Sequence, residues 1–378
     1  MIFYFLVFFV LCILSLYEVL SRKKINNVFY FVVCTLLISM AGFRWKIGTD
    51  FNHYERLFNL IIGNPNLDLG VEKAFCYISK LLGNFKYLLL FYAFFSVFFA
   101  FLSIRHTKYP FSSFFLYYTF TFLSYDMGRI RQGLAISLCL YALFFLLKNK
   151  RILFYLFIIL AFVIHKTSIV FIFVIALKKM KISDKMVYIT LIVVILCSFL
   201  HIDYYISIFM KKISFLSKYS EYFSSGSEFS GFSFSLKNFR RAILVLLYMK
   251  VYDKNDVQER LYFNLFLFGS IIFYLFKDFP IISERISFYF CVYEIFLIPL
   301  IFNKYRYMIV KVVFMFIYGA YYFLSVISIN ENDYFNMPYI NYQSWIGIEN
   351  HFVLFVTIIS LFSLFLWVII KKNGKNKG

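Results

Sequence analysis

The sequence predicts an all-α, polytopic integral membrane protein. Of its 378 residues, 62% are hydrophobic and only 15% are charged, whereas a soluble domain typically carries about 25% charged residues. The apolar residues come in long blocks, and a helix needs roughly 20 such residues to cross a bilayer. These blocks recur along the whole chain, so we expect a single transmembrane domain over residues 1–378.

The formal net charge of +20 indicates membrane topology rather than nucleic-acid binding. The basic residues punctuate the apolar blocks, and the cytoplasmic loops of membrane proteins are enriched in Lys and Arg. The six cysteines form no close CxxC pair, which argues against a disulfide framework and against a metal site. We therefore expect no nucleic-acid partner, no metal and no cofactor.

The first apolar block, MIFYFLVFFVLCILSLYEVL, is expected to be a retained first span. No basic residue precedes it, and the basic run at 22–24 follows it. A cleaved signal peptide has the opposite order, and positive charge marks the cytoplasmic end of a span. Six further basic segments are placed in the cytoplasm, at 104–110, 148–151, 178–185, 250–260, 303–307 and 371–378.

Two crossings then fit between most neighbouring basic segments. They are 27–43, 87–104, 111–125, 132–147, 186–203, 239–252, 260–276, 287–303, 307–328 and 351–370. The block 152–177 is interrupted at His165 and Lys166. We expect a broken helix or hairpin near His165, because non-helical backbone is tolerated in a membrane where it lines a protein cavity. The total is about 13 helices, in a range of about 11 to 14, with the N-terminus outside.

The same alternation defines the external segments. They are 44–86, 126–131, 165–166, 204–238, 277–286 and 329–350. Within the first of these, VEKAFCYISKLLG at 71–83 spaces its apolar residues at helical intervals. This pattern predicts an amphipathic helix that lies on the outer surface of the membrane.

Cations gather in the external segments, against the insertion bias. They are Arg44, Lys46, Arg129, Arg131, Lys166, Arg240, Arg241, Lys277 and Arg285. Ionisable residues at membrane depth usually face a cavity, and the Arg guanidinium donates bidentate hydrogen bonds to phosphate. The set predicts one electropositive, outward-facing cavity for a lipid phosphate or pyrophosphate. The alternative is structural, with the same cations at helix ends reaching toward lipid headgroups.

Four segments resemble, in this order, elements of the EpsG/Wzy-type polysaccharide polymerases. They are FRWKIGTDFNHY (43–54), RIRQGLAISL (129–138), LAFVIHKTSIV (160–170) and SERISFYF (283–290). These segments are similar to the family's FR…GTDY…Y, RQ..A, H.S and R….YF elements, with Phe51 in place of the usual Tyr.

The resemblance implies a glycosyltransferase of bacterial capsule, exopolysaccharide or O-antigen assembly. Such a polymerase lies in the cytoplasmic membrane with its active site facing the periplasm or exterior. It moves a growing glycan from undecaprenyl pyrophosphate onto the next lipid-linked repeat unit. The implied partners are this lipid-linked oligosaccharide, membrane lipid, and the flippase and chain-length regulator proteins of the same assembly system.

Candidate site residues follow from the charges and the resemblance together. Arginines suit a pyrophosphate leaving group, and an acceptor hydroxyl needs a base within hydrogen-bond reach. The expected pyrophosphate ligands are Arg44, Arg131, Arg285 and, as a secondary choice, Arg129. The candidate bases are His165, which is favoured, then Asp50, and third Glu72. Gln132 is expected to hydrogen-bond a sugar, and Trp45, Tyr54 and Tyr125 to stack on sugar faces.

Each candidate also has a structural alternative. Asp50 would cap a helix or pair with Arg44, His165 would bond a free carbonyl where its helix breaks, and Glu72 would belong to the polar face of a surface helix. Two other functions stay open as well. An O-antigen ligase or another polyprenyl-linked glycosyltransferase needs a similar site, and only the motif order favours a polymerase. A flippase or transporter of lipid-linked oligosaccharide should carry charges through the middle of several spans, whereas here they collect at one face.

Overall fold

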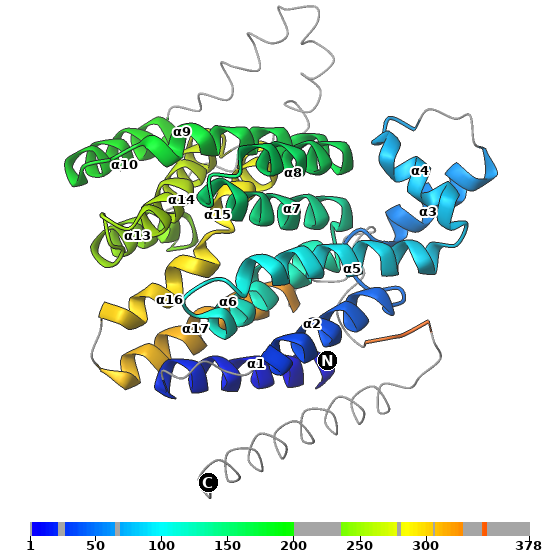
Figure 1. Ribbon diagram of the computed structural model, residues 1–378, viewed down its shortest axis with the longest axis horizontal. Helices are drawn as coiled ribbons and strands as arrows, with labels where there is room; N and C mark the ends of the chain where they lie inside the picture. Colours follow the sequence, from blue (N-terminus) through cyan, green and yellow to red (C-terminus); the bar gives the residue numbers. More distant parts are fainter. Residues whose placement is uncertain are drawn as a thin grey trace, which may run out of the picture. The chain divides into compact units, whose positions relative to one another are not determined.

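The computed structural model describes residues 2–21, 27–64, 69–199, 236–277, 281–304, 307–327 and 342–345 (Figure 1). Over these ranges the chain is helical, and an isolated β-bridge pairs Arg44 with Ser344. The chain divides into two compact units. Unit 1 comprises Met1–Lys166 and Met308–Gly378, and unit 2 comprises Thr167–Tyr307.

Some predicted segments lie outside the described residues. They are the basic run 22–24, nearly all of the loop 204–238, the segments 329–341 and 346–350, the last span 351–370 and the basic tail 371–378.

Unit 1 contains most of the long helices. They are α1 (Ile2–Ser21), α2 (Asn27–Gly42), α3 (Phe51–Gly63), α4 (Lys73–Leu82), α5 (Phe85–Ile104), α6 (Pro110–Tyr117), the π-helix η1 (Tyr118–Asp126), α7 (Ile130–Leu147), α8 (Arg151–Ile164) and α17 (Met308–Ile327). By length and composition, α1, α5 and α7 are long and apolar enough to cross a membrane. The apolar stretches of α2, α8 and α17 are shorter.

Unit 2 contains the remaining described elements. They are α9 (Val174–Lys179), α10 (Asp184–Phe199), α13 (Leu236–Val251), α14 (Val257–Leu275), the π-helix η3 (Ile281–Ile286), α15 (Ser287–Cys291) and α16 (Glu294–Lys304). A 3₁₀ segment, η2 (Lys166–Phe173), leads into this unit from α8.

Two predicted crossings are not single α-helices. The block 111–125 forms α6 and then η1, and the block 287–303 forms α15 and α16. The block 152–177, which the sequence predicts to be a broken helix or hairpin, is α8, η2 and α9. The break in the last of these is at His165, as the polar interruption in the sequence predicts. The described residues thus form helices, three of them long and apolar enough to span a membrane, while the total of about 13 crossings remains a prediction from hydrophobic length.

The helices of unit 1 place two sets of connections at opposite ends. At one end the Glu18 carboxylate accepts hydrogen bonds from the backbone N–H groups of Phe111 (3.2 Å) and Ser112 (2.9 Å), at the start of α6. At that same end the ring of His106, after α5, stacks on Phe144 of α7 with centroids 4.6 Å apart. Both contacts join helix ends that the sequence assigns to the same, cytoplasmic side.

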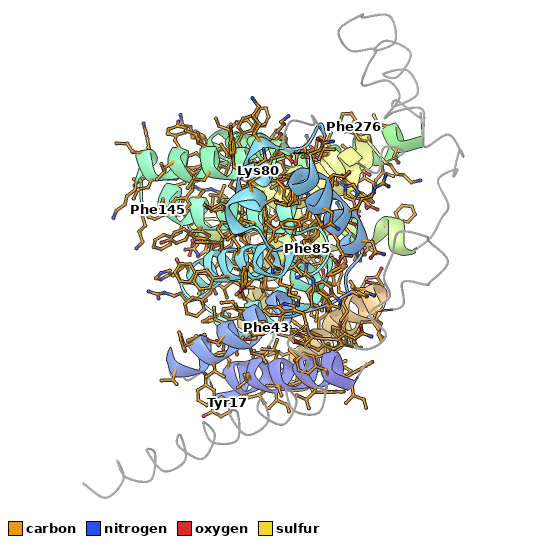
Figure 2. All side chains as sticks on the ribbon, turned by 90° about the vertical axis from the view of Figure 1, so that its right-hand side faces the viewer. Tyr17, Phe43, Lys80, Phe85, Phe145 and Phe276 are labelled. Carbon is orange, nitrogen blue, oxygen red and sulfur yellow. The ribbon has the colours of Figure 1, made fainter. Side chains whose placement is uncertain are left out.

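The opposite end of unit 1 carries α3 and α4, which lie beyond the start of α5 (Figure 1). Figure 2 faces this end and labels Phe43 after α2, Phe85 at the start of α5 and Lys80 on α4. Phe85 anchors α3, because its ring meets Phe51 (5.4 Å) and Phe58 (5.7 Å). Described residues of the segments 44–86, 126–131 and 165, which the sequence predicts to be external, meet at this end: Gly48 lies against Met127, and Glu72 contacts His165.

Aromatic rings fill the interior of unit 1. The ring of Phe8 on α1 contacts Phe115 of α6 (5.1 Å) and Phe323 of α17 (4.7 Å). A Cβ added at Gly319 of α17 would lie 2.4 Å from the Phe115 ring, so only glycine allows this close approach. Because an aromatic side chain buries 150–250 Å² in general, these contacts explain how a chain with 24% aromatic residues packs its helices.

Candidate functional site

Two residues from separate elements of unit 1, Arg131 and His165, both contact the carboxylate of Glu72. Glu72 immediately precedes α4, Arg131 lies in the first turn of α7, and His165 terminates α8. Arg131 Nη1 forms an ion pair with Glu72 Oε2, and His165 Nδ1 lies 2.9 Å from Glu72 Oε1. We refer to Glu72, Arg131 and His165 as the Glu72 cluster. One carboxylate thus holds a permanent cation and an imidazole side by side.

The local sequence explains why Glu72 is held in place. It is the residue before α4, where the positive end of the helix dipole favours a carboxylate. The helix ends at Gly83, whose φ of 61° provides the left-handed conformation common after helices. Phe75 and Ser79, one turn apart, are the buried residues of α4. The buried face therefore orients the start of the helix, and with it Glu72.

His165 lies where α8 stops. Its own N–H donates to the Ala161 carbonyl at 2.8 Å, but its φ of −153° and ψ of 111° are extended. The next N–H, that of Lys166, donates to Glu72 Oε1 at 3.4 Å. Glu72 therefore accepts bonds from both the side chain and the backbone at the break, and the broken helix delivers the imidazole to the carboxylate.

The hydrogen bond to Glu72 sets the protonation pattern of His165. When Nδ1 donates to a carboxylate, the neutral imidazole keeps a lone pair on Nε2. That Nε2 atom is buried, and no hydrogen-bond partner for it occurs in the part of the chain that the structure describes. A buried, unbonded imidazole nitrogen next to a carboxylate has the arrangement of a general base waiting for a hydroxyl group.

The side chains of the Glu72 cluster are mostly buried, and its carboxylate is ionised. Burial alone would raise the pKa of the Glu72 carboxyl, but the His165 hydrogen bond and the Arg131 charge outweigh it and lower this pKa to about 2. The side chains of Arg131, Glu72 and His165 are only 14%, 11% and 15% exposed. Electrostatic interactions are stronger in such a site than in bulk water.

Two aromatic rings support the guanidinium of Arg131. It lies 5.4 Å from the ring centroid of Tyr54 on α3 and 5.3 Å from that of Phe75 on α4. These distances are within the range of cation–π attraction. Tyr54 is 4% exposed, so its ring packs under Arg131 and is not open for stacking on a sugar.

Arg44, an expected pyrophosphate ligand, lies buried just after α2. It is 1% exposed, and its guanidinium donates to the Ala41 carbonyl and, through Nε at 3.2 Å, to the Ile47 carbonyl. Because α2 ends at Gly42, the Ala41 carbonyl belongs to a last turn that lacks helical partners and attracts a cation. Arg44 thus ties the end of α2 to the loop that follows.

The other predicted residues are not members of the Glu72 cluster. Asp50 is half-buried at the start of α3 and makes no capping hydrogen bond with its side chain. Arg129 precedes α7 and lies 5.7 Å over the Tyr125 ring, and Gln132 is buried in the first turn of α7. Arg285 belongs to unit 2, where it is exposed on η3.

The GTD turn of the first motif supports the start of α7. Gly48 has a φ of 106°, and a Cβ there would lie 2.0 Å from the Met127 carbonyl oxygen. A Cβ at Gly128 would in turn lie 2.6 Å from Thr49 Oγ1. These glycines let the turn after α2 pack directly against the connection from η1 to α7, which carries Arg131.

Asp126 is a buried carboxylate near Arg131 in the sequence that was not among the candidate residues. Asp126, at the end of η1, is 2% exposed. It accepts hydrogen bonds from the Tyr117 hydroxyl at 2.6 Å and from the Ser96 hydroxyl. A Cβ at Gly133 would lie 2.8 Å from its Oδ1. An acid that directly follows an apolar block is the signal that would have indicated it.

The fold and the site together define a multi-pass helical membrane protein with a buried ionic cluster at one end of a helical unit. The model of the EpsG family matches residues 27–344, and the chain belongs to this family. Membership confirms the resemblance and indicates a polysaccharide polymerase. No curated protein and no solved structure matches the chain. The match includes all three residues of the Glu72 cluster.

Proposed function

We propose that the protein transfers a growing glycan from undecaprenyl pyrophosphate to the next lipid-linked repeat unit. The transfer takes place at the outer face of the bacterial cytoplasmic membrane, for capsule, exopolysaccharide or O-antigen. The observation that carries this proposal is the Glu72 carboxylate in contact with both Arg131 and His165. The flippase and chain-length regulator of the same system are the proposed protein partners.

His165 acts as the general base in this proposal. Its free Nε2 accepts the proton of an acceptor sugar hydroxyl, and the oxygen attacks the anomeric carbon of the donor. Glu72 keeps the Nδ1 proton in place and stabilises the imidazolium that forms. General bases of this kind typically contribute 10²- to 10⁴-fold to a rate.

Arg131 stabilises the leaving group. As the bond between the anomeric carbon and the pyrophosphate oxygen breaks, the electron pair stays on that oxygen. A guanidinium in a site of low exposure stabilises this charge strongly, and Arg131 is 14% exposed. We propose Arg129 and Gln132, beside Arg131 at the start of α7, as contacts to the substrate. Arg285, on η3 of unit 2, stays a candidate pyrophosphate ligand on the strength of its family motif alone.

Two predicted residues receive other roles in the proposal. Arg44 positions the turn after α2, because its guanidinium is buried and bonded to backbone carbonyls. Asp50 starts α3, which carries Tyr54 under Arg131. We therefore place neither residue in the reaction itself.

Replacement of His165 tests the proposal. In cells that carry the complete assembly system, His165→Asn should abolish long polymer and leave single repeat units on the lipid at the outer leaflet. His53→Asn is the matched control, because His53 is an exposed histidine on α3 at the same end of unit 1. Normal polymer from His165→Asn would refute the base. Single units trapped at the inner leaflet would point to a transporter.

A further inference from the structure

Two tryptophans and a lysine meet at the end of unit 1 that carries the Glu72 cluster. Lys86 Nζ lies 5.6 Å from the ring centroid of Trp45 and 5.3 Å from that of Trp345. Trp45 follows α2, Lys86 is in the first turn of α5, and Trp345 belongs to the segment 342–345. We call these residues the tryptophan clamp. Each side chain is half-buried and so accessible to a ligand.

Backbone pairing holds the two indole rings in place. The Trp45 N–H donates to the Gln343 carbonyl at 2.9 Å, and the Trp345 N–H donates to the Phe43 carbonyl at 3.1 Å. The indole Nε1–H of Trp345 donates to the Gly42 carbonyl at 3.0 Å. An indole of the membrane interface turns its polar tip toward the headgroups, whereas this one is bonded to the protein. The rings are therefore ordered before a ligand arrives, which lowers the cost of binding.

The neighbours of the Lys86 ammonium are uncharged indole rings. Its ammonium faces two rings, and no ion pair with a carboxylate joins it within the described ranges of the chain. An ammonium has three N–H donors. Cation–π attraction to the rings does not occupy these donors with an acceptor atom, so they can still donate to an anion. The clamp thus combines apolar rings with a cation suited to an anionic group.

We propose that the tryptophan clamp binds an acidic sugar of the glycan, with the sugar carboxylate on Lys86 and its C–H face against the indoles. This inference rests on the proposed function, since the clamp lies at the same end of unit 1 as the Glu72 cluster. A charge-assisted hydrogen bond to the carboxylate provides selectivity for an acid. The rings provide a rigid apolar surface for the C–H face of a sugar. A small inorganic anion has no such face, so the rings favour a sugar acid over it.

Intrinsic fluorescence tests the clamp directly, because the chain has three tryptophans and two of them belong to the clamp. Full-length protein in lipid nanodiscs is titrated with methyl glucuronide, methyl glucoside and inorganic phosphate. The glucuronide should bind about tenfold or more tightly than the glucoside, as expected for a hydrogen bond to a charged group. Lys86→Met should remove this preference, Lys86→Arg should retain it, and Lys73→Met, at an exposed lysine of α4, should leave it unchanged.

Three outcomes would overturn the proposal. The first is equal binding of glucuronide and glucoside, and the second is a preference that survives Lys86→Met. The third is phosphate binding as tight as glucuronide binding and lost in Lys86→Met, which would assign the clamp to a lipid phosphate. His165→Asn should bind the glucuronide normally while failing to polymerise. A failure of the clamp is therefore distinguishable from a failure of the proposed base.

Discussion

Glu72→Gln removes one negative charge from the centre of the Glu72 cluster with little change in volume. The variant leaves Arg131 without its carboxylate partner. It also offers His165 Nδ1 an amide in place of a carboxylate. When that amide donates its N–H to Nδ1, the imidazole proton moves to Nε2, and the base is blocked.

The burial of the cluster sets the magnitude. Arg131 and Glu72 are 14% and 11% exposed, so their pair resembles a buried one, for which removal of one partner costs about 3–5 kcal/mol. We expect the lower end, about 3 kcal/mol of folding stability, because some water contact remains. The loss of an oriented base should lower the polymerisation rate by about 100-fold or more.

The assay separates these two effects. Thermal stability of the purified protein in nanodiscs reports folding, and the ratio of polymer to single lipid-linked units in cells, corrected for protein level, reports activity. Glu72→Asp should restore part of the activity because it restores the charge. Glu55→Gln on α3 is the control, with the same chemical change outside the cluster. Wild-type stability together with wild-type polymer in Glu72→Gln would refute the reasoning.

Three further predictions concern stability, each measured by thermal unfolding in nanodiscs. Gly48→Ala should cost about 2 kcal/mol or more, because its φ is 106° and a Cβ would lie 2.0 Å from a carbonyl oxygen. Gly70→Ala, where φ is 64° with open space around the Cβ, should cost only about 1 kcal/mol; equal costs would contradict the predicted clash. Asp126→Asn should cost about 1–3 kcal/mol, since it disturbs a buried hydrogen-bonded carboxylate. Asp184→Asn, at an ion pair about half exposed, should stay within about 0.5 kcal/mol, and a larger loss there would reverse the ranking. The pKa of Glu72 is lowered from 4.5 to about 2, so its stabilising effect is fully present above about pH 4.5 and is lost as the pH falls toward 2. The stability difference between wild type and Glu72→Gln should therefore stay constant from about pH 8 to 5 and shrink only below about pH 4.5; a difference that shrinks near neutral pH would contradict an ionised Glu72.

The helical fold could be predicted because long apolar blocks have few alternatives in a membrane. The break at His165 was visible as well, since a polar pair interrupts its block. The π-helical segments η1 and η3 were not predictable. These segments lie in or beside runs of apolar residues with no polar face, so the sequence has no periodicity that distinguishes a π-helix from an α-helix. It therefore does not indicate where the backbone hydrogen bonds change from one pattern to the other.

The candidate site was predicted in its residue types but not in its grouping. Glu72 ranked last among the bases, yet it joins Arg131 and His165, which lie 59 and 93 positions further along the chain. Contacts at such separations depend on how the helices pack, which a single sequence does not reveal. Arg44 matched a family motif, and its guanidinium is bonded to backbone carbonyls. A motif match alone does not distinguish a residue that binds ligand from one that stabilises a turn.

The central claim is that Glu72 and His165 act as one unit, and a double-mutant cycle tests it most directly. Polymerisation is measured for Glu72→Gln, His165→Asn and the double variant at matched protein levels. Groups that act together in one step are strongly non-additive. We predict that the double variant falls within about threefold of His165→Asn alone. The claim would be contradicted if the two losses multiplied. The polymerisation rate of the double variant would then be lower than that of His165→Asn by the full factor that Glu72→Gln causes on its own.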